Sequence, residues 1–109
     1  MDKKEDSIYN YEKITTEEAI YFMDRGNVRI VDVRRMEEFE SGHIRGAICI
    51  PNEDIDLDEP EQLSDKKEDI LVYCQSGRRS QNAALKLVRM GYENIKDFGG
   101  IEDWSYGTE

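Results

Sequence analysis

The feature that most constrains the fold is an apolar segment that runs directly into a glycine-containing loop and then into an amphipathic helix. The apolar segment is Ile70–Cys74, the loop covers 75–79, and the helix is predicted over roughly 80–90 with Gly91 after it. A short run of β-branched and aromatic residues favours a buried strand, and apolar residues on one face of the following segment favour a helix. A strand that leads through a tight loop into a helix is the repeating unit of α/β proteins.

Similar units precede and follow this segment. Thr15 and Glu18 have the spacing of a capping box, which predicts a helix through about Arg25 that ends at Gly26. Other apolar or alternating runs predict strands at 11–14, 28–33, 47–50 and 94–98, and a short helix at 36–40. Short strands that alternate with helices indicate an α/β fold with a small, mainly parallel five-stranded sheet flanked by helices on both faces.

The rest of the chain gives weaker structural signals. Residues 1–10 are charged and aperiodic, so we expect a flexible N-terminal tail followed by a single domain over 11–109. A chain of 109 residues has room for one such domain and one core. Residues 52–68 are polar and acidic, and three apolar residues within them are candidate anchors for short helices: Ile55, Leu57 and Leu63.

The composition narrows the classes of protein to consider. Hydrophobic residues make up 38% and charged residues 37%, which is typical of a soluble globular protein with a charged surface. The net charge of −10 argues against general binding to nucleic acid or to anionic membranes. No apolar run approaches the roughly 20 residues needed to span a bilayer, and the start lacks an apolar signal-peptide core. We therefore expect a cytoplasmic protein.

The charges are unevenly distributed along the chain. Residues 53–69 carry nine acidic side chains against two lysines, whereas residues 74–90 carry four basic side chains and no acidic one. A basic segment in an acidic protein is a candidate site for a small anion. A helix with a solvated basic face would give the same pattern, so charge alone does not decide between them.

The residues from Cys74 to Ser80 have the composition of an anion-binding cup. A loop between a buried strand and a helix N-terminus directs several backbone N–H groups into one concave space. Gly77 permits the positive φ that such a tight curve needs, and the helix dipole adds positive potential. We expect the cup to favour the nucleophilic thiolate form of Cys74 at neutral pH. The candidate binding loop comprises Gln75, Ser76, Gly77, Arg78, Arg79 and Ser80.

A cup of this kind suits two reactions. Cys74 attacks a phosphate whose oxygens are held by arginine, or it attacks the outer sulfur of a sulfonyl-type donor and carries that sulfur as a persulfide. A third interpretation is an inert cysteine at the end of a buried strand. The combination of cysteine, glycine and arginine between a strand and a helix favours the reactive cysteine.

Four segments, taken in order, resemble the motifs of the rhodanese family. They are residues 32–34 (Asp-Val-Arg), residues 42–47 (Gly-His-Ile-Arg-Gly-Ala), the Cys74 loop, and residues 99–104 (Gly-Gly-Ile-Glu-Asp-Trp). Each segment alone is weak evidence, but all four in this order are highly specific. The resemblance extends over roughly residues 11–105.

This resemblance implies a rhodanese-type thiosulfate sulfurtransferase in which Cys74 forms a persulfide held by the backbone amides of its loop. It implies a small anionic sulfur donor such as thiosulfate, and cyanide, a thiol or a protein as acceptor. It implies no cofactor and no metal. By the same resemblance, Asp32, Arg34 and His43 are structural residues that link the motif loops.

The position of Arg79 separates the two reactions. Four residues lie between Cys74 and Arg79, whereas the related phosphatases of the same architecture have five, because phosphate needs a longer loop. A phosphatase also usually needs an acid to protonate its leaving group, whereas sulfite leaves as a stable anion. The sequence thus favours a sulfurtransferase, with a small cysteine-dependent phosphatase and a non-catalytic rhodanese-fold binding or regulatory module as alternatives.

The second cysteine and the single histidine have structural interpretations. Cys49 lies in the middle of a predicted strand, so we expect an inert core residue rather than a resolving thiol. His43 follows Gly42 in a turn, and we expect a hydrogen-bonded turn residue rather than a general base. Two cysteines separated by 24 residues have neither a zinc-site spacing nor that of a redox pair.

Four side chains near the motifs are candidates for contacts at the site. Arg79 is the expected donor-binding arginine, whereas Arg78 either contacts the donor or lies in solvent. Trp104, with Tyr106, either packs against the domain or forms a wall of the cup.

Overall fold

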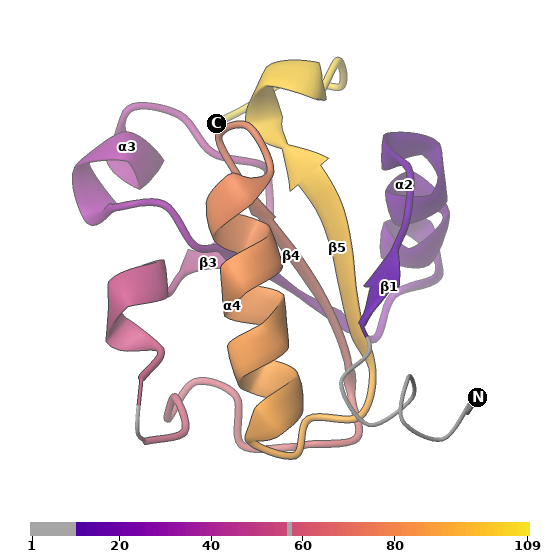
Figure 1. The fold of residues 1–109 in the computed structure, drawn as a ribbon. Helices are drawn as coiled ribbons and strands as arrows, with labels where there is room; N and C mark the ends of the chain where they lie inside the picture. Colours follow the sequence, from indigo (N-terminus) through magenta and orange to yellow (C-terminus); the bar gives the residue numbers. More distant parts are fainter. Residues whose placement is uncertain (1–10, 57) are drawn as a thin grey trace.

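A computed structural model describes residues 11–56 and 58–109, which form one parallel sheet with helices around it (Figure 1). The strand order is β1–β5–β4–β2–β3, and every neighbouring pair is parallel. The strands are β1 (Glu12–Lys13), β2 (Val28–Asp32), β3 (Ala47–Cys49), β4 (Asp69–Cys74) and β5 (Ile95–Gly100). The helices are α2 (Thr16–Arg25), α3 (Met36–Glu40) and α4 (Arg78–Arg89), with short 3₁₀ turns η1 (Asn52–Asp54) and η2 (Ile101–Asp103).

The most apolar strand, β4, is the central one. Its residues 70–74 are all buried, because β2 and β5 flank it and both faces of the sheet are covered. Alternate side chains of β4 point to opposite faces. Ile70, Val72 and Cys74 pack with residues of α4, and Leu71 and Tyr73 pack with residues of α2.

These two packed faces confirm the predicted α/β class. In Figure 1, α4 lies across the sheet, and α2 lies beyond the edge strand β1. Ala83, Ala84 and Leu87 of α4 belong to one apolar cluster. Ala19, Phe22 and Met23 of α2 belong to the other cluster. The five-stranded parallel sheet with helices on both faces is therefore as predicted.

The predicted capping box begins α2. The Glu18 N–H donates to Thr15 Oγ1 at 3.0 Å, and the Thr15 N–H donates to Glu18 Oε1 at 2.8 Å. Both bonds satisfy amides that a helix start otherwise leaves without partners. Gly26, at φ +80°, ends the helix as expected.

Most element boundaries lie within one residue of the sequence prediction, and the larger differences lie near the Cys74 loop and in the acidic segment. Helix α4 begins at Arg78 instead of about residue 80, because Gly77, at φ +105°, is its N-cap. Strand β5 extends to Gly100, and its register with β4 shifts so that Cys74 faces Gly100. In the segment 52–68, the 3₁₀ turn η1 is the only helical element among the described residues.

The anchors predicted in the acidic segment have mixed outcomes. Ile55 and Leu63 are buried in the cluster under α4, as expected. Leu57 and the predicted tail 1–10 lie outside the described residues. Among the helices that the structure describes, none has the length and apolar character needed to cross a membrane.

Candidate active site

Cys74 lies where β4 ends, beneath the first turn of α4. Its Sγ accepts hydrogen bonds from the Gly77 N–H at 3.0 Å and the Ser80 N–H at 3.3 Å. The side chain is only 1% exposed, so the sulfur sits at the base of the loop, not on the open surface. Gly77 adopts the left-handed conformation that turns its N–H inward. Backbone amides therefore converge on the sulfur, as the loop sequence predicts.

Gly100 supports this loop from beneath. A Cβ at position 100 would lie 2.1 Å from the carbonyl oxygen of Gln75, so only glycine fits there. The Glu102 N–H also donates to that oxygen, at 3.3 Å. Gly100 belongs to one of the four family motifs, but no role at the site was predicted for it. A glycine pair at the end of a strand is a signal for close backbone approach, and it would have indicated this contact.

Asp97 is a second residue that the sequence analysis missed. Its Oδ1 accepts from Ser80 Oγ at 2.8 Å and from the Gly99 N–H at 2.9 Å. Its Oδ2 is buried and has no hydrogen-bond partner among the described residues. Burial raises the pKa of this carboxyl above its usual value, although the bonds from Gly99 and Ser80 oppose the shift. Asp97 thus ties the end of β5 to the residue whose N–H contacts Cys74.

Asp32 and Arg34 form a buried ion pair beside the loop. The guanidinium donates to both carboxylate oxygens, with Nη2 2.8 Å from Oδ2 and Nε 3.0 Å from Oδ1. Arg34 Nη2 also donates to the Gly42 carbonyl at 2.7 Å, and Nη1 lies 3.5 Å from Gln75 Oε1. One side chain therefore joins the segment after β2, the turn at 42 and the Cys74 loop, which is the linking position that the family resemblance implied.

His43 packs within its own turn. Its ring stacks on Phe39 at a centroid separation of 3.9 Å, and Nδ1 lies 3.0 Å from the Phe39 carbonyl oxygen. Its backbone N–H and carbonyl both bond to Glu109, at 3.0 and 2.8 Å. These contacts are those of a turn residue that orders the segment between α3 and β3.

Arg79 faces Glu38 of α3. Its Nη1 and Nη2 donate to the two carboxylate oxygens at 2.8 and 3.1 Å. These bonds lower the pKa of Glu38 to about 2 and raise that of Arg79 further above its usual value. Arg78, by contrast, is exposed on the first turn of α4. Both arginines lie within the helix and not in the loop where the sequence placed them, and Ser80 lies in the helix as predicted. Gln75, Ser76 and Gly77 form the loop itself.

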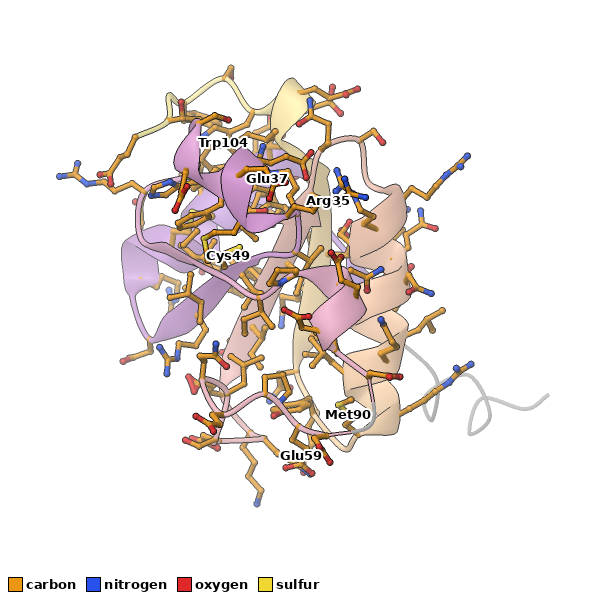
Figure 2. All side chains as sticks on the ribbon, turned by 90° about the vertical axis from the view of Figure 1, so that its left-hand side faces the viewer. Arg35, Glu37, Cys49, Glu59, Met90 and Trp104 are labelled. Atoms are coloured by element: carbon orange, nitrogen blue, oxygen red, sulfur yellow. The ribbon has the colours of Figure 1, made fainter. Side chains whose placement is uncertain are left out.

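Cys49 is separated from Cys74 by the sheet. Its β3 position pairs with Asp32, and Asp32 pairs with Tyr73 on the other side, so Cys49 and Tyr73 share a face. Cys74 points to the opposite face. Strands β3 and β4 are two strand spacings apart, which is about 10 Å at about 4.8 Å per spacing. This separation is too large for a disulfide between Cys49 and Cys74. Burial raises the pKa of the Cys49 thiol to about 11. Figure 2 shows Cys49 below α3, away from the start of α4.

Trp104 packs against the fold. Its ring lies 5.7 Å from Phe98, and its indole N–H donates to the Gly107 carbonyl at 2.9 Å. Tyr106 packs edge-on against it and is half exposed. In the described part of the chain, no group of three or more His, Cys, Asp or Glu side chains is arranged to hold a metal ion.

Residues 15–106 match the family of rhodanese-like domains. The chain belongs to the rhodanese-like family. Over 73 residues it is 36% identical to thiosulfate sulfurtransferase PspE of Escherichia coli, covering 67% of this chain and 70% of PspE. Over 95 residues it is 33% identical to thiosulfate sulfurtransferase GlpE of Coxiella burnetii, covering 86% of this chain and 87% of GlpE.

Solved structures of rhodanese-like proteins have the same fold. A rhodanese with anions from E. coli superimposes with a TM-score of 0.68 at 32% identity, over 75% of this chain and 96% of that one. The family assignment predicted from the four motifs is therefore confirmed. At the level of the family, these relatives support a sulfurtransferase of the rhodanese type.

Proposed function

We propose that this rhodanese-like domain is a sulfurtransferase that carries sulfane sulfur as a persulfide on Cys74. The observation that carries the proposal is the pair of N–H groups, from Gly77 and Ser80, directed at the Cys74 sulfur. Amides that converge on a sulfur atom stabilise negative charge there, both on a thiolate and on the persulfide that replaces it.

In the first half-reaction, the Cys74 thiolate attacks the outer sulfur of thiosulfate. A new S–S bond forms to Cys74, the S–S bond of thiosulfate breaks, and both bonding electrons leave on sulfite. Three negative charges enter the step and three leave it, because a thiolate and a dianion become a persulfide anion and a sulfite dianion. No proton donor is needed, since sulfite is a stable leaving anion.

In the second half-reaction, a nucleophilic acceptor attacks the terminal sulfur of the persulfide. With cyanide, a C–S bond forms, the Cys74 S–S bond breaks, and the electron pair returns to the Cys74 thiolate as thiocyanate leaves. A thiol or a protein thiolate accepts sulfur in the same way. The cycle closes without a cofactor or a metal.

The residues around the cup hold its shape. Asp97 fixes Ser80, whose N–H is one of the two donors to Cys74. Arg34 joins the turn at Gly42 to Gln75 and is itself held by Asp32. His43 orders the same turn from the side of α3. These are positioning roles, because the hydrogen bonds to the Cys74 sulfur come from backbone N–H groups and not from these side chains.

The loop length favours this function over a cysteine-dependent phosphatase. Arg79 follows Cys74 after four residues, and its guanidinium lies against Glu38. A phosphatase needs its arginine on the phosphoryl oxygens and an acid for the leaving group. The two acids whose side chains hydrogen-bond to residues of the first turn of α4 are committed elsewhere: Asp97 is buried under Ser80, and Glu38 is paired with Arg79.

A steady-state assay separates these functions and the non-catalytic module. The protein, with thiosulfate and cyanide, should release thiocyanate, and Cys74→Ser should release none. Cys49→Ser is the matched control and should retain most of the activity. Hydrolysis of p-nitrophenyl phosphate in place of thiocyanate release would support the phosphatase. Failure of both reactions would support a binding module.

A further inference from the structure

The arginine expected to bind the donor, Arg79, is already matched by a carboxylate. Arg79 and Glu38 form two parallel hydrogen bonds, at 2.8 and 3.1 Å, the bidentate arrangement that Arg–carboxylate pairs prefer. Their side chains are 33% and 32% exposed, so the pair is partly removed from water. An anion that enters the cup therefore meets a neutralised arginine, not a free one.

Glu38 is held firmly in this position. The Arg35 N–H donates to Glu38 Oε1 at 2.9 Å, which closes the first turn of α3. Because the bonds from Arg79 lower the pKa of Glu38 to about 2, the carboxylate is charged throughout the physiological pH range. Figure 2 shows α3, with Arg35 and Glu37, at the same end of the molecule as the start of α4.

The other arginines around the cup do not replace the positive charge of Arg79 that Glu38 neutralises. Arg34 is buried in its pair with Asp32. Arg78 is exposed, and the Arg35 side chain is 66% exposed with Glu53 at 4.0 Å. Charges in open solvent are screened and act weakly on a small anion. The electrostatic preference of the cup therefore depends strongly on Glu38.

We propose that Glu38 determines donor specificity by disfavouring donors that carry two negative charges. The interaction of a donor with Glu38 scales with the charge of the donor, so a dianion such as thiosulfate is opposed twice as strongly as a monoanion. The favoured donors are monoanions in which an organic group replaces one charged oxygen of thiosulfate on the sulfonyl sulfur, such as an organic thiosulfonate. This inference rests on the proposed sulfurtransferase function and specifies the substrate class of the same site.

A pair of alkylating reagents tests the charge effect without any turnover. The Cys74 thiolate attacks the CH2 carbon of either iodoacetate or iodoacetamide and displaces iodide; the two reagents have nearly the same size, but only iodoacetate is charged. We follow alkylation of Cys74 by peptide mass spectrometry and divide the rate with iodoacetate by the rate with iodoacetamide. Glu38→Gln should raise this ratio about three- to fivefold. Glu37→Gln removes the same charge from the neighbouring exposed residue and should change the ratio less than about twofold.

This ratio distinguishes specificity from a merely structural role of Glu38. A looser loop changes the reactivity of the thiolate toward both reagents, so that effect cancels in the ratio. An unchanged ratio in Glu38→Gln, or an equal rise in Glu37→Gln, would overturn the inference.

The donors themselves provide the second measurement. Thiosulfate and benzenethiosulfonate both transfer one sulfur to the Cys74 thiolate, and they release sulfite and benzenesulfinate respectively. In Glu38→Gln, the fold increase in kcat/KM for thiosulfate should be about the square of the increase for benzenethiosulfonate. Equal increases, or a fall for thiosulfate, would overturn the inference but leave the sulfurtransferase proposal intact. No sulfur transfer from either donor in any variant would overturn both.

Discussion

At Cys74 the sulfur atom already accepts hydrogen bonds from the N–H groups of Gly77 and Ser80, at 3.0 and 3.3 Å. Its chemistry therefore depends on residues that hold those amides in place. Gly100 permits the close approach of the loop, and Asp97 fixes Ser80. Neither touches the sulfur, yet both determine where the amides point.

Gly100→Ala should displace the loop. The added Cβ would lie 2.1 Å from the Gln75 carbonyl oxygen, and backbone cannot yield as a side chain can. We expect the free energy of unfolding, measured by urea denaturation, to fall by about 2–3 kcal/mol, and sulfur transfer to be lost. Gly26→Ala meets no atom within 4 Å. This control should cost about 1–3 kcal/mol, because Gly26 lies at φ +80° and ψ −178°, a conformation essentially confined to glycine, and it should keep the activity. Wild-type activity in Gly100→Ala would contradict this role.

Asp97 should make stability depend on pH in a definite direction. Burial raises its pKa, so the folded state holds the proton more tightly than the unfolded chain. Stability from this group is present below the unfolded pKa of about 3.9 and is lost as pH rises toward the folded pKa. Urea denaturation between pH 4 and pH 8 should therefore show wild type losing stability relative to Asp97→Asn. A difference in the free energy of unfolding between the two proteins that stays constant from pH 4 to pH 8 would contradict the raised pKa of Asp97.

Among the elements, α3 and α4 are joined by Glu38 and Arg79. No residue of α3 is buried, so this pair is a principal attachment of the helix to the site. Glu38 and Arg79 lie 41 residues apart in the sequence, and Ser80 and Asp97 lie 17 residues apart, so both contacts join separate segments of the chain.

Glu38→Gln should reduce stability at neutral pH and less so in acid. The pKa of Glu38 is lowered from its usual value to about 2, so its contribution is present above about pH 4.5 and is lost as pH falls toward 2. Because the pair is one-third exposed and screened by solvent, we expect Glu38→Gln to lower the free energy of unfolding by only about 1 kcal/mol at pH 7. Urea denaturation of the wild-type protein and of Glu38→Gln at pH 7 and pH 3 measures this difference in the free energy of unfolding. A larger difference at pH 3 than at pH 7 would contradict the prediction.

The sequence predicted the elements better than it predicted their contacts. The capping box at Thr15 is a local pattern and was correctly located, whereas the loop after Cys74 was predicted two residues too long. The start of α4 was placed two residues late, because a left-handed glycine serves as its N-cap. The partners Glu38 and Asp97 depend on how distant segments pack, which no local pattern encodes, whereas the glycine pair at residues 99–100 is a local signal of close backbone approach.

At the scale of the whole molecule, the sheet order places the reactive residue. Strand β4 is central, both its faces are packed, and Cys74 lies at its carboxyl end. Parallel sheets bind ligands at that edge. The alternation of strands and helices predicted the parallel sheet but not the order of its strands. The charge balance at the cup was not predictable, since Glu38 comes from a different segment.

The central claim is that Cys74 carries the transferred sulfur, and intact-protein mass spectrometry tests it most directly. After incubation with thiosulfate and removal of the donor, the wild-type protein and Cys49→Ser should each gain the mass of one sulfur atom. Cys74→Ser should gain none, and cyanide should reverse the gain in the other two. A wild-type protein that takes up no sulfur from either thiosulfate or benzenethiosulfonate, or a Cys74→Ser variant that still does, would contradict the account.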